Sequence, residues 1–206
     1  MTYPMKSHDH LAQDPVMAEL IERFGKLRLS SGSSEPYEAL SEAVIYQQLN
    51  GKAASTILGR YMEQLGGGGL PTPKQVLNAS DEALRAAGIS RNKAAALRDI
   101  ARHAQDGRLP TRAECAKLSD EALIERLTDI RGIGRWTVEM FLMFNLGRPD
   151  ILPVDDLGVR KGYQAVKAAS ELPAPKALAE TGRRWSPYRS LAALYLWRAA
   201  DMTSEA

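Results

Sequence analysis

The chain has a single cysteine, Cys115, among its 206 residues. One thiol cannot form a disulfide framework within the chain, nor can it supply a four-cysteine metal or iron–sulfur site. The sequence also lacks any apolar run that approaches the roughly 20 residues of a membrane helix. Residues 1–13 carry His8, Asp9 and His10 and lack the apolar core of a secretory signal. We therefore expect a cytoplasmic protein, where one reduced cysteine is ordinary.

Neither positive nor negative charge is in large excess. The chain has 27 lysines and arginines and 25 aspartates and glutamates, which gives a net charge of +2. This balance permits nucleic-acid binding but is equally common in enzymes of small metabolites. Several basic residues could contact phosphate, although scattered basic residues are usually only a solvated surface. They are Arg91, Lys93, Arg131, Arg135, Arg160 and Lys161.

Strand-like alternation is scarce, and apolar residues recur at helical spacing over most of the chain. We expect an all-α fold of roughly ten helices. Asp14-Pro15 is typical of an N-cap and first helical residue, and so is Ser186-Pro187, which should start a last helix through Trp197. Other helices are expected at 37–49, at 52–65, from Thr72-Pro73, at about 156–169 and from Pro175.

One short segment occurs twice. Ser80-Asp-Glu-Ala-Leu84 returns as Ser119-Asp-Glu-Ala-Leu123, and each copy places an N-cap before acids that suit the first turn of a helix. Each copy leads to a glycine, Gly88 or Gly132, and then to another helix. The repeat indicates either two independently capped helices or two related helix–turn–helix units.

The stretch from Leu127 to Glu139 predicts two helices joined by a hairpin that contains Gly132 and Gly134. Glycine lets the backbone approach a ligand closely, and the N–H groups at the start of the second helix suit a phosphate. A plain connection between two helices has the same pattern, so the hairpin alone does not decide between them.

Two adjacent carboxylates, Asp155 and Asp156, follow Pro153 and precede a predicted helix. Either one could be only the N-cap of that helix. Either could also stabilise positive charge in a reaction, because an anion near a forming cation lowers the barrier.

Taken together, Ile130-Arg-Gly-Ile-Gly-Arg-Trp136 and Leu152-Pro-Val-Asp-Asp156 resemble the helix–hairpin–helix (HhH-GPD) DNA glycosylases. More narrowly they resemble the AlkA-like branch, 3-methyladenine DNA glycosylase II. The resemblance extends over residues 14–24, 43–54 and 185–197. It implies one glycosylase unit over residues 1–206, built from two helical subdomains with a DNA-binding cleft between them. One would be about 37–149, with the hairpin, and the other about 1–36 plus 150–206.

The resemblance implies that Asp156 is the catalytic carboxylate, because Leu157-Gly-Val-Arg160 follows it as in the family, and that Asp155 is a cap or a support. Breaking a purine N-glycosidic bond builds positive charge on the sugar, which a carboxylate stabilises. Trp136 stands where the strand-nicking members carry a lysine that forms a Schiff base. The expected product is therefore an abasic site.

The resemblance also assigns roles to other positions, although each has an ordinary packing or surface alternative. The base pocket would contain Trp136, Trp197, Met140 (where some members have tyrosine) and Tyr46. The side chain that fills the gap left by a flipped base, here called the wedge, would be Gln48 or Leu49. DNA would be contacted by Gly132, Gly134, Arg135, Thr137 and Arg131. Apart from a possible Na⁺ or K⁺ on the backbone carbonyls of Thr128, Ile130 and Ile133, no cofactor is expected.

The sequence thus predicts a monomeric, monofunctional DNA glycosylase of base-excision repair. It would remove alkylated purines such as 3-methyladenine and 7-methylguanine from double-stranded DNA, with no membrane partner. One alternative is a helix–hairpin–helix DNA-binding module without chemistry, against which Asp156 and Trp136 together argue. The other is a glycosylase with lyase activity toward other damaged bases, which Trp136 disfavours.

Overall fold

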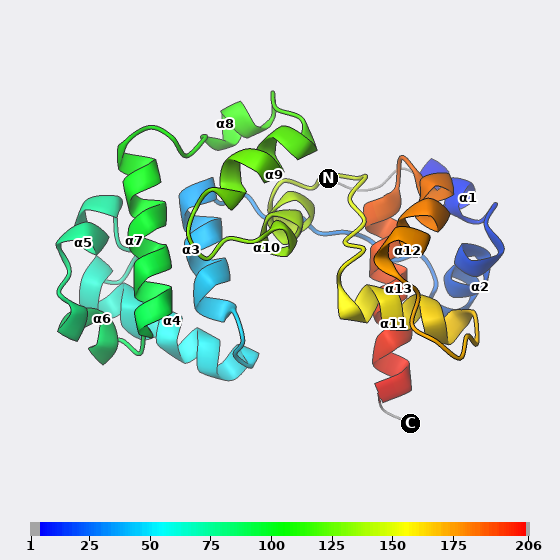
Figure 1. Ribbon diagram of the computed structural model, residues 1–206, viewed down its shortest axis with the longest axis horizontal. Coiled ribbons are helices and arrows are strands. Elements are labelled where there is room, and N and C mark those ends of the chain that lie inside the picture. The colour runs from blue at the N-terminus through cyan, green and yellow to red at the C-terminus, as the bar shows by residue number, and fades with distance from the viewer. Residues whose placement is uncertain (1–4, 205–206) are drawn as a thin grey trace. The chain divides into compact units, whose positions relative to one another are not determined.

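The computed structural model of the protein describes residues 5–204 (Figure 1), and these form thirteen α-helices, one π-helical turn, one 3-10 turn and no strand. The all-α prediction is confirmed. There are more helices than the roughly ten expected, because several are only one or two turns long, such as α8 (Arg112–Cys115). Among residues 5–204, no helix is both long and apolar enough to cross a bilayer.

The chain folds into two compact units. Unit 1 contains Met1–Gly32 and Leu142–Ala206, and unit 2 contains Ser33–Phe141. Unit 2 is therefore inserted, in sequence, between the two parts of unit 1.

Unit 2 is built around α7 (Arg91–Gln105), whose Ala96, Leu97, Ile100 and Ala101 are buried against α3, α5 and α6. The other helices of this unit are α3 (Pro36–Tyr46), α4 (Gly51–Gly66), α5 (Pro73–Asn78), α6 (Asp81–Ala86), α8, α9 (Asp120–Thr128) and α10 (Arg135–Met140).

The repeated segment has the same local structure in both copies. The Ser80 hydroxyl accepts the Ala83 N–H at the start of α6, and the Ser119 hydroxyl accepts the Ala122 N–H at the start of α9. Each helix is followed by a glycine with a left-handed backbone, at φ 92° and 80° respectively. The next helix begins three residues after that glycine in both copies, so the repeat is one helix–turn–helix pattern used twice.

Unit 1 is built around α13 (Arg189–Ser204), which is buried from Leu191 to Ala193 and again at Tyr195 and Leu196, and which packs against α11 and α2. The other elements of the unit are α1 (Met5–Leu11), α2 (Pro15–Phe24), the π-helical turn (Phe141–Asn145, of which Phe141 belongs to unit 2), α11 (Leu157–Val166), α12 (Pro175–Gly182) and the 3-10 turn (Arg183–Trp185). As predicted, Asp14 caps α2, since its carboxylate accepts the N–H groups of Val16 and Met17.

The predicted start of the last helix at Ser186-Pro187 is wrong, because α13 begins at Arg189 and continues past Trp197. The Ser186 hydroxyl donates to Asp150 Oδ2 at 2.7 Å instead of capping a helix. Asp150 does the capping, since its Oδ1 accepts the Arg189 N–H at 3.2 Å. A carboxylate from a distant loop thus replaces the local serine.

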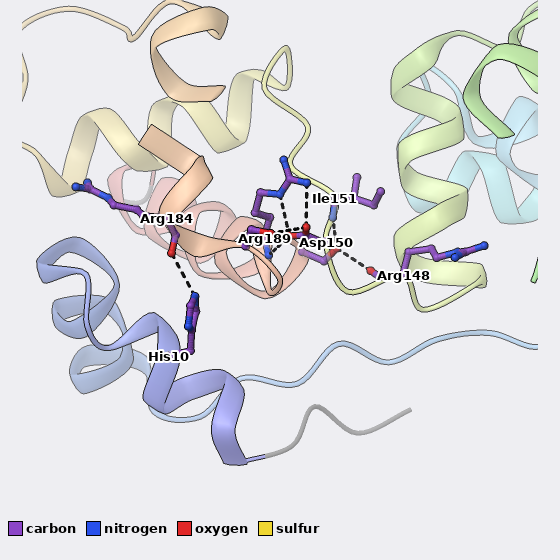
Figure 2. A network of polar contacts seen from close by, with 8 residues as sticks. His10, Arg148, Asp150, Ile151, Arg184 and Arg189 are labelled. Atoms are coloured by element: carbon purple, nitrogen blue, oxygen red, sulfur yellow. Dashed lines mark hydrogen bonds and ion pairs between the residues drawn. The ribbon is translucent and has the colours of Figure 1, made fainter. Parts of the chain in front are cut away.

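The same loop is fixed to the first turn of α13 by further bonds (Figure 2). The Arg189 guanidinium donates to both carboxylate oxygens of Asp150, at 2.8 and 3.0 Å. The Ser190 hydroxyl donates to the Arg148 carbonyl at 2.7 Å and accepts the Ile151 N–H at 2.9 Å. These bonds anchor the loop that leads to Asp155 and Asp156.

We predict that Asp150→Asn lowers the free energy of unfolding by about 2 kcal/mol near neutral pH, because it weakens a bidentate ion pair and a cap together. Burial raises the pKa of Asp150, but bonds from Arg189 and Ser186 more than offset this, so the pKa lies below its ordinary value. A lowered carboxyl pKa stabilises the fold above the pKa of the unfolded chain, about 3.9, and this contribution disappears as the pH falls through the folded-state pKa.

Urea unfolding of wild type and Asp150→Asn from pH 7 down to pH 2.5 measures this effect. The difference between the two proteins should be constant down to about pH 5 and shrink below about pH 4. A difference that stays the same at low pH would contradict the assigned role of the Asp150 charge.

Candidate functional site

The hairpin between α9 and α10 needs Gly132 for structural reasons. This glycine has a left-handed φ of 80°, and a Cβ on it would lie 2.8 Å from the Ala96 Cβ of α7. Next to it, the Arg131 N–H donates to Asp99 Oδ2 of α7 at 2.9 Å. The hairpin is therefore held against the central helix of unit 2.

Gly134 differs from Gly132. Any residue can adopt its φ of −94°, and a Cβ at this position would have no atom within 4 Å. It stands directly before the first turn of α10, so its missing side chain leaves the start of that helix uncovered. Of the two hairpin glycines, only Gly134 leaves open space that a ligand could use.

The predicted DNA-contacting side chains around the hairpin are engaged to different degrees. Arg131 is exposed, whereas Arg135 pairs with Glu121 at 2.8 Å and with the buried Glu139 at 3.1 Å. Thr137 is buried, and its hydroxyl accepts a bond from Gln47 Nε2 at 3.4 Å. A contact between Thr137 and DNA would therefore have to use its backbone.

Other basic side chains expected on the surface are bonded within the protein. Lys93 Nζ donates to the carbonyl oxygens of Ile45 and Gln47, and Arg160 Nε donates to the Pro173 carbonyl. For these two residues the expectation of a phosphate contact gives way to a structural role.

The helix predicted for residues 37–49 ends at Tyr46, three residues early, in a turn that carries the candidate wedge. The Ile45 and Gln47 carbonyls point at Lys93, and the Leu49 N–H donates to the Tyr46 carbonyl at 3.3 Å. Gln48 has a φ of 57°, which costs a residue with a side chain on the order of 1–3 kcal/mol. The surroundings must hold this conformation.

Unit 2 has a pocket of about 580 Å³ that brings several predicted site residues together. Trp136 and Tyr46 are 47% and 41% exposed, so neither is an ordinary core aromatic. The candidate wedge residues share this pocket with the candidate base-binding residues. It is lined by Ala43, Tyr46, Gln47, Gln48, Leu49, Trp136, Thr137 and Met140.

The carboxylate that caps α11 is Asp156. Its Oδ1 accepts the Val159 N–H and the Trp197 indole N–H, both at 2.8 Å. Of the two roles expected for Asp155, cap or support, the cap is wrong, because Asp155 is exposed and precedes the cap position. The structure thus places Trp197 against the candidate catalytic group within unit 1, where its ring also lies 5.9 Å from the Phe144 ring.

Two glycines of α11 that the sequence analysis did not single out make this arrangement possible. A Cβ on Gly158 would lie 2.8 Å from Trp197 Cδ1 and 3.1 Å from Asp156 Oδ1. A Cβ on Gly162 would collide with the backbone carbonyl of Leu196. Residues four apart share one face of a helix, so the spacing of these glycines was a readable signal for close packing against another helix.

The carbonyls proposed for a monovalent cation lie in and just before the hairpin. The Ile130 oxygen already accepts the Ile133 N–H at 3.1 Å, so it offers a cation only its second lone pair. The Thr128 hydroxyl is bonded to the Ile124 carbonyl. Within residues 5–204, histidine, cysteine, aspartate and glutamate form no cluster suited to a metal ion.

The chain is similar to proteins of one family. Residues 41–187 match the family model described as "HhH-GPD superfamily base excision DNA repair protein". A "DNA-3-methyladenine glycosylase 1" from Schizosaccharomyces pombe is 40% identical over 96% of this chain and 88% of that protein.

Two solved structures are similar over nearly the whole chain. The S. pombe 3-methyladenine DNA glycosylase (Mag1) in complex with abasic DNA has 40% identity and a TM-score of 0.83, covering 94% of this chain and 96% of its own. A DNA-3-methyladenine glycosidase from Bacillus halodurans has 38% identity and a TM-score of 0.88, covering 100% and 94%.

The two hairpin glycines allow a matched test of stability. Gly132→Ala should lower the free energy of unfolding by roughly 2–4 kcal/mol, because it combines a left-handed backbone with a clash against Ala96. Gly134→Ala should change it by no more than about 0.5 kcal/mol, since the poorer N-cap is offset by a less flexible unfolded chain. Urea unfolding of both variants measures this, and equal losses would contradict the separate roles.

Proposed function

Because the chain belongs to the HhH-GPD superfamily of base excision DNA repair proteins, we propose that it is a monofunctional DNA glycosylase that releases alkylated purines and leaves an abasic site. The observation that carries the proposal is the Asp156 carboxylate, which the Trp197 and Val159 N–H groups orient at the start of α11. The Val159 bond is an ordinary helix cap, whereas the Trp197 bond brings a second N–H to the same oxygen and orients the carboxylate beyond what capping requires.

The names of the relatives support the substrate class. The S. pombe relative is a DNA-3-methyladenine glycosylase, and the solved structure of Mag1 from the same organism is a complex with abasic DNA. On that basis we extend 3-methyladenine and binding to DNA to this chain. We further propose 7-methylguanine as a substrate, because it too is an alkylated purine, with double-stranded DNA as the partner and a monomer as the active form. The proposed location is cytoplasmic, where the chain would be associated with DNA.

In the proposed reaction Asp156 acts on the sugar. Departure of the base builds positive charge on the deoxyribose, and a nearby carboxylate stabilises it and orients the attacking water. Both N–H groups bond to Oδ1, so they fix the plane of the carboxylate before the reaction begins. An alkylated purine is already a cationic leaving group, so no second acid is required.

The pocket of unit 2 is the proposed receptor for the flipped base. The exposed rings of Trp136 and Tyr46 offer aromatic faces to a cationic base, each worth roughly 0.5–2 kcal/mol. Met140 lines the same pocket, where its side chain can adapt to base shape. Gln48 and Leu49, which also line it, are the proposed wedge.

The hairpin is the proposed contact with the DNA backbone. Gly134 leaves the start of α10 uncovered, and the exposed Arg131 adds charge nearby. In the same proposal, a bound Na⁺ or K⁺ on the carbonyls of Thr128, Ile130 and Ile133 would add positive charge to the turn.

Asp156→Asn separates the charge of this residue from its structural roles. Asparagine caps helices as well as aspartate does and keeps an oxygen for the Trp197 N–H, so fold and stability should persist. Base release from methylated duplex DNA should fall by roughly 100-fold or more, because the amide cannot balance the sugar cation. Free base is measured by chromatography.

Asp155→Asn is the matched control, since it removes the neighbouring exposed carboxylate and should release base at nearly the normal rate. If Asp155→Asn is inactive while Asp156→Asn is active, the catalytic carboxylate has been assigned to the wrong residue.

The product should be an abasic site in an intact strand. Trp136 cannot form an imine with the sugar, so borohydride should trap no enzyme–DNA adduct, and strands should break only after alkali or heat. Lys161 is the lysine to exclude, although it is five residues beyond Asp156 and points about 140° away around the helix. A trapped adduct that is absent in Lys161→Ala would show lyase activity and overturn the monofunctional assignment.

A further inference from the structure

The turn from Tyr46 to Leu49 holds a conformation that its own sequence does not favour. Gln48 has a left-handed φ of 57°, which residues with a side chain rarely adopt outside a supporting structure. The helix before the turn ends at Tyr46, and Asn50 caps the next helix by accepting the Ala53 N–H at 2.8 Å. Some interaction outside the turn must therefore hold the three residues between Tyr46 and Asn50.

Lys93 of α7 supplies one such interaction. Its Nζ donates to the Ile45 carbonyl at 2.7 Å and to the Gln47 carbonyl at 2.9 Å. These two oxygens stand on either side of the point where α3 ends, so one ammonium group bridges the helix end and the turn. Burial lowers the pKa of Lys93, in keeping with a side chain directed into the protein.

Gln47 supplies a second interaction, and it connects the turn to the hairpin. Its Nε2 donates to the Gly132 carbonyl at 3.0 Å and to the Thr137 hydroxyl at 3.4 Å. Gly132 belongs to the hairpin, and Thr137 lies in the helix that follows it. A path of hydrogen bonds thus runs from α7 through the turn to the proposed phosphate-binding element, all within unit 2.

We infer that Lys93 and Gln47 are positioning residues that hold Gln48 and Leu49 in the one conformation able to enter a DNA duplex when a base leaves it. The inference rests on the proposed function and adds to it a device for base flipping. Because Gln47 bonds to the hairpin, the wedge keeps a fixed position relative to the backbone contact. Neither Lys93 nor Gln47 needs to touch the reacting atoms.

The test compares two duplex substrates that differ only opposite the alkylated base. In one the base is paired with thymine, so a pair must be broken; in the other it faces an abasic-site analogue, so no pair is broken. Lys93→Met keeps the length of the side chain and removes its N–H donors. It should slow single-turnover release from the paired substrate about tenfold or more, and release from the unpaired substrate by less than about twofold.

Two further variants make the result specific. Lys74→Met removes an exposed lysine of α5 and should leave both rates unchanged. Gln48→Gly with Leu49→Ala removes both candidate wedge side chains, and glycine suits the left-handed backbone, so this double variant should slow release from the paired substrate alone. Adding Lys93→Met to the double variant should cause no further loss, because no wedge side chain is left for Lys93 to position.

The outcomes separate the inference from the proposed function. If wild type releases no base from either substrate, the proposed function fails, and 2-aminopurine fluorescence beside the lesion still reports whether Lys93 is needed for opening the pair. If folded Lys93→Met slows both substrates equally, or loses activity additively with the Gln48→Gly and Leu49→Ala double variant, the inference is overturned. Gln47→Leu removes the bonds to the hairpin and leaves Lys93 in place. If Lys93→Met does not fold, Gln47→Leu serves as the test instead. A ratio of release rates from the paired and unpaired substrates that equals the wild-type ratio would then overturn the inference.

Discussion

The approach of α11 to α13 at Gly162 is the contact on which the rest of unit 1 depends. The α-carbon of this glycine packs against the Leu196 carbonyl, at a distance that no side chain would permit. One turn earlier, Gly158 leaves room for the Trp197 indole beside Asp156. Close packing of two backbones therefore fixes the direction of a carboxylate, and the Asp150 bonds fix the loop that leads to it.

In unit 2, hydrogen bonds hold the turn that follows α3. Lys93 donates to the Ile45 and Gln47 carbonyl oxygens where α3 ends, and Gln47 Nε2 donates to the Gly132 carbonyl of the hairpin. These bonds leave Tyr46 and Leu49 at the surface, beside Trp136. Large apolar side chains kept at a surface are typical of a binding site.

Local signals in the sequence predicted local structure well. Asp14, Ser80 and Ser119 cap the expected helices because each cap needs only the next few residues. Ser186 did not behave as predicted, because its hydroxyl found a better partner in Asp150, far away in the chain. The Trp197 indole that donates to Asp156 is likewise far away in the chain, and so is the Ile45 carbonyl that accepts from Lys93. Such tertiary partners leave no mark in the neighbouring sequence, whereas the paired glycines of α11 did.

The division of unit 1 between the two ends of the chain has a consequence for synthesis on the ribosome. Residues 33–141 emerge as one continuous block, so the helices of unit 2 can assemble before the remainder is made. The apolar face of α2 meanwhile lacks its packing partner, because α13 comes after all the other described helices in the chain. A nascent chain that stops before Trp197 contains the hairpin and the pocket but lacks the indole that donates to Asp156, so the proposed catalytic carboxylate gains this bond only after unit 2 has been made.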